Sequence, residues 1–140
     1  MAVRRDGMEL CDLYEDGAVT RMEKDIYELI CQEEHIPFSR LKSLLGIRKE
    51  SASRFETATV RLQSRMFITI CGESRKFTAS GEAYGWPVNV FCPIEAAFDT
   101  ELWEDACSYD AAEAETLIRN HILRLNPTAD EKAIRKFIRG

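Results

Sequence analysis

Basic side chains gather in the middle of this chain, where they can bind a polyanion. Residues 40–76 carry nine Lys and Arg against three Asp and Glu, although the formal net charge of all 140 residues is −5. Charges farther apart than about 8–10 Å are largely screened at physiological salt, so a basic middle can keep a positive face between acidic ends. Charge alone favours nucleic-acid binding and a solvated helix surface without a partner equally.

Three arginines of this region share one face of a helix that we expect to end near residue 63 or 64. At about 100° per residue, Arg54, Arg61 and Arg65 lie within about 40° of one another. The neighbouring face carries the stripe that we expect in the core: Phe55, Thr59, Leu62 and Met66. Arginines on an exposed helix face can contact DNA phosphates or guanine edges. The alternative is that they only keep the helix soluble, with Arg54 pairing with Glu50.

The other reactive side chains predict no catalytic residue, cofactor or metal site. His35 and His121 are far apart, and the acidic stretch 99–115 is interpreted as a solvated helix surface. The five cysteines have no C-x-x-C spacing, so we expect reduced thiols, most of them buried as small apolar side chains. They are Cys11, Cys31, Cys71, Cys92 and Cys107. The sequence contains neither a glycine-rich phosphate loop nor a serine-nucleophile elbow.

Local signals predict two helices ahead of the helix that carries the arginines. Thr20 and Glu23 have the spacing of a capping box and begin a helix over residues 21–34, which Pro37 ends. A short second helix should end at Gly46, because glycine readily takes the left-handed conformation that closes helices. The arginine-bearing helix comes third, as in a helix-turn-helix.

A β-hairpin is predicted after the third helix. Residues 66–71 and 84–92 are rich in strand-forming side chains, and Pro87 predicts an edge position for its part of the second strand. The polar segment 72–83 would be a loop carrying Arg75 and Lys76. Three helices and a hairpin with a basic loop, or wing, predict a winged helix-turn-helix, in a mainly α fold with a β-hairpin (α+β).

The remaining segments complete a three-part organisation. We expect an N-terminal arm over residues 1–20, the winged-helix domain over residues 21–92, and a helical extension over residues 93–140 packed on that domain. No membrane span or signal peptide is recognisable in the sequence, so we expect a cytoplasmic protein.

Several motifs, in order along the chain, resemble the AlkZ-type DNA glycosylases and their winged-helix relatives. They are residues 13–17 (LYEDG), 49–58 (KESASRFETA), Leu62-Gln63, 84–86 (YGW) and 126–132 (NPTADEK). The resemblance implies a winged-helix fold and a connection with DNA. It does not imply base excision, because the glycosylases carry a Gln-x-Gln or Gln-x-Asp catalytic motif and this chain has Gln63-Ser64-Arg65.

The sequence therefore predicts a protein that binds double-stranded DNA, either a small transcriptional regulator or an accessory to DNA processing. The predicted contacts are Arg48 and Lys49 at the entry of the third helix, Arg54, Arg61 and Arg65 along it, and Arg75 and Lys76 on the wing. A homodimer through the C-terminal helices would be usual for a regulator.

Two alternatives stay open. A protein-interaction module on the same scaffold would expose an apolar patch around Leu117, Ile122, Ile134 and Phe137. The third and least favoured function is DNA glycosylase activity.

Overall fold

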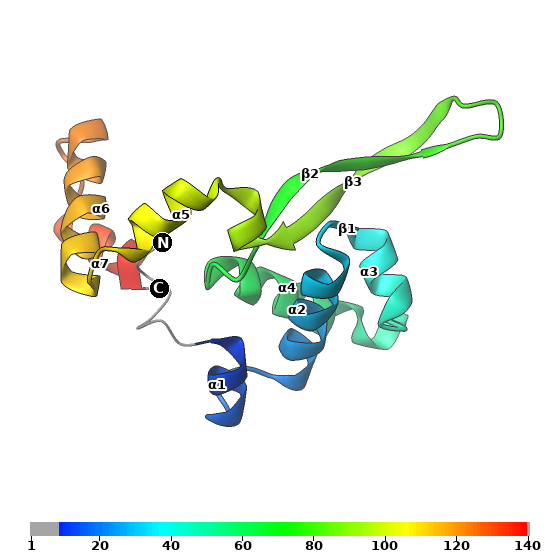
Figure 1. Cartoon of the computed structure of the whole chain (residues 1–140), viewed down its shortest axis with the longest axis horizontal. Coiled ribbons are helices and arrows are strands. Elements are labelled where there is room, and N and C mark those ends of the chain that lie inside the picture. Colours follow the sequence, from blue (N-terminus) through cyan, green and yellow to red (C-terminus); the bar gives the residue numbers. More distant parts are fainter. Residues whose placement is uncertain (1–8, 140) are drawn as a thin grey trace. The chain divides into compact units, whose positions relative to one another are not determined.

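The computed structural model forms two compact units, one of residues 9–98 and one that contains residues 99–139. It describes the backbone of residues 9–139 and their side chains, except those at positions 76, 77, 100, 103, 106, 107 and 139. The described part of the chain is mostly helical with one small antiparallel sheet (Figure 1), which confirms the predicted α+β class. No helix within the described range is long and apolar enough to cross a membrane.

The first unit begins with two helices, α1 (Leu10–Glu15) and α2 (Arg21–Glu33). The predicted capping box starts α2: the backbone N–H of Thr20 donates to Glu23 Oε2 at 2.7 Å, and the Glu23 N–H donates to Thr20 Oγ1 at 3.3 Å. Residues 10–19 belong to the segment predicted as an N-terminal arm, and Leu10 and Val19 are buried in the core of this unit. Their apolar side chains fix the segment to the body.

A two-residue strand and two more helices follow. Strand β1 (Ile36–Pro37) leads directly into α3 (Phe38–Leu44), which closes at Gly46 with a φ of 61°, as predicted. The 3₁₀ turn η2 (Lys49–Ser51) then leads into α4 (Ala52–Ser64). The third helix therefore ends where the sequence predicted.

The sheet is built around a long hairpin of β2 (Ile68–Phe77) and β3 (Ala83–Pro93), with β1 on the other side of β3. The prediction of a loop over residues 72–83 is wrong in its extent, because residues 72–77 continue β2 and only residues 78–82 form the turn. Pairing with β3, a long-range interaction, holds this polar stretch extended. Pro87 lies in the central strand, but β1 pairs with β3 only at Phe91 and Val90, so β3 has one neighbour at Pro87.

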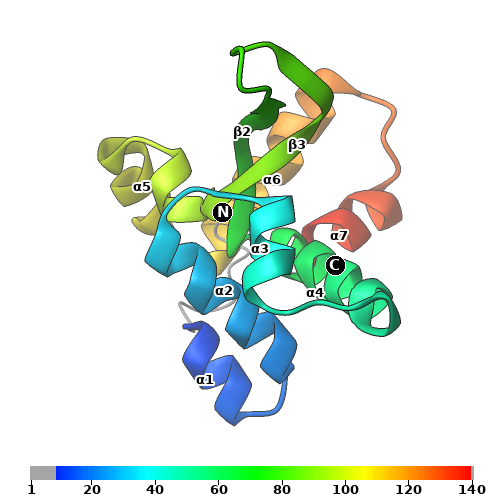
Figure 2. The same cartoon turned by 90° about the vertical axis from the view of Figure 1, so that its right-hand side faces the viewer.

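The core of the first unit lies where α2, α3 and α4 meet one face of the sheet (Figure 2). Its largest fully buried side chains include Phe55 of α4, Phe67 just before β2, and Ile26 and Ile30 of α2. In Figure 1 the turn of the hairpin projects away from these helices. The hairpin tip is therefore attached to a rigid base while its own side chains face solvent.

The short 3₁₀ turn η3 (Ile94–Ala97) ends the first unit, and the second contains α5 (Thr100–Cys107), α6 (Ala111–Leu125) and α7 (Glu131–Arg139). A helical extension was predicted after residue 92, and in the structure the Asp110 side chain caps α6 by accepting from the N–H groups of Ala112 and Glu113. The two units divide between Phe98 and Asp99 rather than at residue 93. Packing of the extension on the first unit stays a prediction.

Candidate nucleic-acid interface

Helix α4 presents one polar face to solvent and one apolar face to the core. The buried face carries Phe55, Ala58, Thr59 and Leu62, which confirms three of the four residues predicted for the core stripe. Met66, the fourth, is half-buried and lies beyond the helix with a φ of 60°. The exposed side chains are Ser53, Arg54, Glu56, Thr57, Val60, Arg61 and Ser64.

Lys42 of α3 contacts residues of both α3 and α4. Its ammonium donates to Glu56 Oε1 at 2.9 Å and lies 4.7 Å from the ring centre of Phe38 and 5.7 Å from that of Phe55. An ammonium over aromatic faces is attracted by the ring electrons. An ion pair and a cation–π contact therefore link α3 to α4.

The three arginines predicted for this face differ in their surroundings. Arg54 and Arg61 are exposed, and neither forms an ion pair within the part of the chain that the structure describes. Arg65 lies at the end of α4, where its Nη1 donates to the carbonyl of Ala18 at 2.9 Å. Arg65 is therefore bonded to the loop between α1 and α2, and Arg54 and Arg61 are better placed to bind an external ligand.

The remaining predicted contacts lie at the entry of α4 and on the hairpin. Arg48 and Lys49 are exposed at the start of the η2 turn. Arg75 is exposed on β2, and its guanidinium lies 3.5 Å from Glu73, a surface pair of small energetic value. The side chain of Lys76 lies outside the described residues.

Exposed aromatic side chains on the hairpin were missed in the sequence. Trp86 is 92% exposed and Tyr84 51% exposed. The register explains why: Ser74 pairs with Val88 and Lys76 with Tyr84, so three residues of β3 oppose one residue of β2. This bulge, with Gly85 at a φ of 76°, turns Trp86 into solvent. Only the Tyr-Gly-Trp-Pro sequence itself, unusual in a strand, signals it.

The Gln63 side chain bonds within its own helix. Its amide Nε2 donates to the carbonyl of Thr59 at 3.4 Å within α4, and the side chain is half-buried. The amide of Gln63 is thus used inside α4.

A family model described as AlkZ related matches residues 1–139. The chain belongs to the AlkZ-related family. This membership confirms the predicted relation to AlkZ and points to a DNA-related function. No curated protein and no solved structure matches the chain.

The cysteines of this AlkZ-related chain are less buried than predicted. Cys11, Cys31 and Cys71 are exposed and Cys92 is buried; Cys107 has no described side chain. Burial, together with the adjacent Cys71 thiol, raises the pKa of the Cys92 thiol from 9.0 to about 12, so Cys92 is protonated at neutral pH. Strand pairing also brings His35 to Cys71 and Cys92, a proximity that sequence spacing could not show.

The C-terminal unit of the AlkZ-related chain exposes part of the apolar patch proposed for a protein partner. Leu117 and Phe137 are exposed, but Ile134 is buried and Ile122 half-buried, since α6 and α7 pack on each other. Arg119 of α6 also pairs with Glu131 of α7. The patch is therefore smaller than predicted.

Proposed function

We propose that this protein is a winged-helix module that binds double-stranded DNA, with α4 as its reading helix and the β2–β3 hairpin as its wing. The element order supports this fold: α2, β1, α3 and α4 are followed by two hairpin strands, and β3 lies between β1 and β2. The observation that supports the function is that a fold with this element order exposes arginines on α4 and exposes Arg75 and Trp86 on the hairpin.

Each part of this surface suits a different feature of the duplex. An α-helix fits the major groove, where arginine can donate to the two acceptors of guanine, so Arg54 or Arg61 can read a base. The cations at the entry of α4 and on the wing contact phosphates, which fix position and carry no sequence information. Exposed Trp86 supplies an apolar wedge of the kind that inserts beside bases in the minor groove.

We propose binding without base excision, as expected of a small regulator or an accessory to DNA processing. A glycosylase must turn its target base into a closed pocket and attack it there. Gln63, which occupies the position nearest the expected catalytic motif, instead bonds to its own helix. A cytoplasmic location and a homodimer through the C-terminal helices stay predictions.

Two alanine variants test the proposal against a control. Arg61→Ala weakens binding to a preferred duplex by about 1–3 kcal/mol where the arginine reads a base, and Lys76→Ala weakens all sequences alike and lowers the salt slope by about 1. Arg21→Ala, which removes an exposed arginine of α2 paired with Asp25, should leave binding unchanged. Fluorescence anisotropy with labelled duplexes measures all three. Unchanged affinity and salt slope in both interface variants would refute this binding surface.

A further inference from the structure

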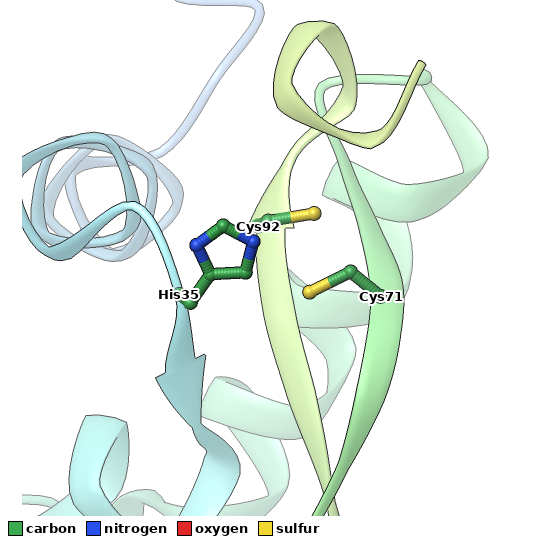
Figure 3. Close-up of side chains that lie close together, drawn as sticks. All are labelled: His35, Cys71 and Cys92. Atoms are coloured by element: carbon green, nitrogen blue, oxygen red, sulfur yellow. The ribbon is translucent and has the colours of Figure 1, made fainter. Parts of the chain in front are cut away.

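Three side chains able to bind a metal ion meet on the sheet, away from the proposed interface on α4. The imidazole of His35 and the thiols of Cys71 and Cys92 all lie within 4.8 Å of one another. Figure 3 shows the Cys71 and Cys92 thiols extending from neighbouring strands, with the imidazole beside them. No role in DNA binding is proposed for any of the three.

The strand register brings the three residues together. Ile36 pairs with Phe91 and Thr69 pairs with Cys92, so one further step of the first register places His35 beside Cys92. Each residue therefore comes from a different strand or its immediate start. Because side chains alternate along a strand, Cys92 faces away from the helical core into which Phe91 points.

Two local irregularities aim the outer ligands at Cys92. The register shifts between Ile70 and Gly72, so Cys71 is an extra residue in β2. The Cys71 thiol donates to the carbonyl of Val90 on β3, with Sγ 3.5 Å from the oxygen. His35 follows a tight turn in which Glu34 has a φ of 59° and the His35 N–H donates to the Glu33 carbonyl at 2.6 Å. Such a turn is strained for a residue other than glycine.

The set of ligands suits zinc. Zinc binds thiolates at about 2.3 Å and imidazole nitrogens at about 2.0–2.1 Å in tetrahedral geometry, which separates ligand atoms by about 3.5–3.8 Å. The present separations, all under 4.8 Å, reach those values with small rotations of the exposed His35 and Cys71 side chains. Two soft thiolates and an imidazole favour zinc over magnesium or calcium, which prefer oxygen ligands.

We propose that His35, Cys71 and Cys92 form a zinc site with a fourth position open to water. On binding, the two thiols lose their protons to solvent and become thiolates. The ion links all three strands. Its main structural effect falls on β1, which has only two residues paired with β3. Holding β1 also holds the start of α3, which follows it directly.

Cobalt titration of reduced, tag-free, chelator-treated protein tests the site. Tetrahedral cobalt with two thiolates gives visible ligand-field bands and a near-ultraviolet sulfur-to-cobalt band, and zinc added afterwards should remove both. We expect saturation at one cobalt per chain. Elemental analysis of protein dialysed against zinc should give the same stoichiometry, and zinc should raise the unfolding temperature.

Matched variants separate this site from adventitious binding. Cys71→Ser and His35→Asn replace exposed side chains, so the fold should persist by circular dichroism while the cobalt bands are lost. Cys11→Ser and His121→Asn, which alter exposed residues outside the cluster, should keep the wild-type spectrum. Absence of the bands in the wild-type protein, or their survival in either cluster variant, would overturn the proposal.

Discussion

Replacing Trp86 with alanine should weaken DNA binding without changing either the fold or the salt dependence. The indole is 92% exposed, so its removal takes no core contact away, and substitutions of this kind change stability by less than about 0.5 kcal/mol. Trp86 is also uncharged. The number of phosphates neutralised, which sets the salt slope, should therefore stay the same.

The size of the effect follows from the area that the indole can bury. A tryptophan side chain can bury up to about 250 Å² of surface. If the DNA covers rather less than half of the indole, about 100 Å² of its surface is removed from water. At about 25 cal/mol per Å², this contact contributes about 2.5 kcal/mol, or about 60-fold in affinity. Stacking of bases on aromatic side chains, at about 1–3 kcal/mol each, gives the same range.

Anisotropy titrations at several salt concentrations give both quantities from one experiment. Trp86→Ala should shift the dissociation constant by about 10- to 100-fold at every salt concentration, giving parallel lines in a log–log plot. Tyr109→Ala, which truncates an exposed aromatic residue between α5 and α6, is the control. An unchanged affinity would show that the wing does not contact DNA through its aromatic residue, and a changed slope would show that the substitution disturbs the cationic contacts.

Three further predictions concern stability and chemistry. Thr20→Ala removes the N-cap of α2 and the hydroxyl bonded to buried Glu23, so a urea titration should show a free energy of unfolding lower by about 1–2 kcal/mol. Thr116→Ala, at an exposed position of α6, is the control and should change this free energy by less than about 0.5 kcal/mol. The guanidinium of Arg119 lowers the pKa of Glu131 in the folded protein. The pair therefore stabilises the fold at pH values above the pKa that Glu131 has in the unfolded chain, and this stabilisation is lost as the pH falls through the pKa of the folded state. The melting temperature of Glu131→Gln should therefore be lower than that of the wild type at pH 7 and approach it in acid. A difference in melting temperature that persists in acid would contradict this. Alkylated duplex DNA incubated with the protein should yield no abasic product, and any protein-dependent release would restore glycosylase activity as the function.

Local signals account for the parts of the fold that the sequence predicted. The Thr20–Glu23 capping box, the left-handed Gly46 and the apolar stripe of α4 each depend on residues within about one or two helical turns. Such features can be recognised in a single sequence. They were enough to order the helices and to place Arg54 and Arg61 on an exposed face.

The features of the sheet that were missed depend on long-range pairing. The polar residues 72–77 have no strand pattern of their own and are extended because β3 pairs with them. The two-residue strand β1 exists only through its pairing with β3. The Trp86 bulge and the meeting of His35 with two cysteines depend on the same register, which sequence spacing does not determine.

The most direct test of the central claim is binding of the wild-type protein to a random-sequence duplex between about 50 and 200 mM salt. The cations of α4, its entry and the wing should make about four to six phosphate contacts, which predicts a slope of about −3.6 to −5.4 for the logarithm of the binding constant against the logarithm of the salt concentration. The affinity should therefore fall by about 100- to 2000-fold over this range. A slope of that size would support the cationic surface. Absence of binding at the lowest salt would contradict the account, because the acidic remainder of the chain would then outweigh that surface.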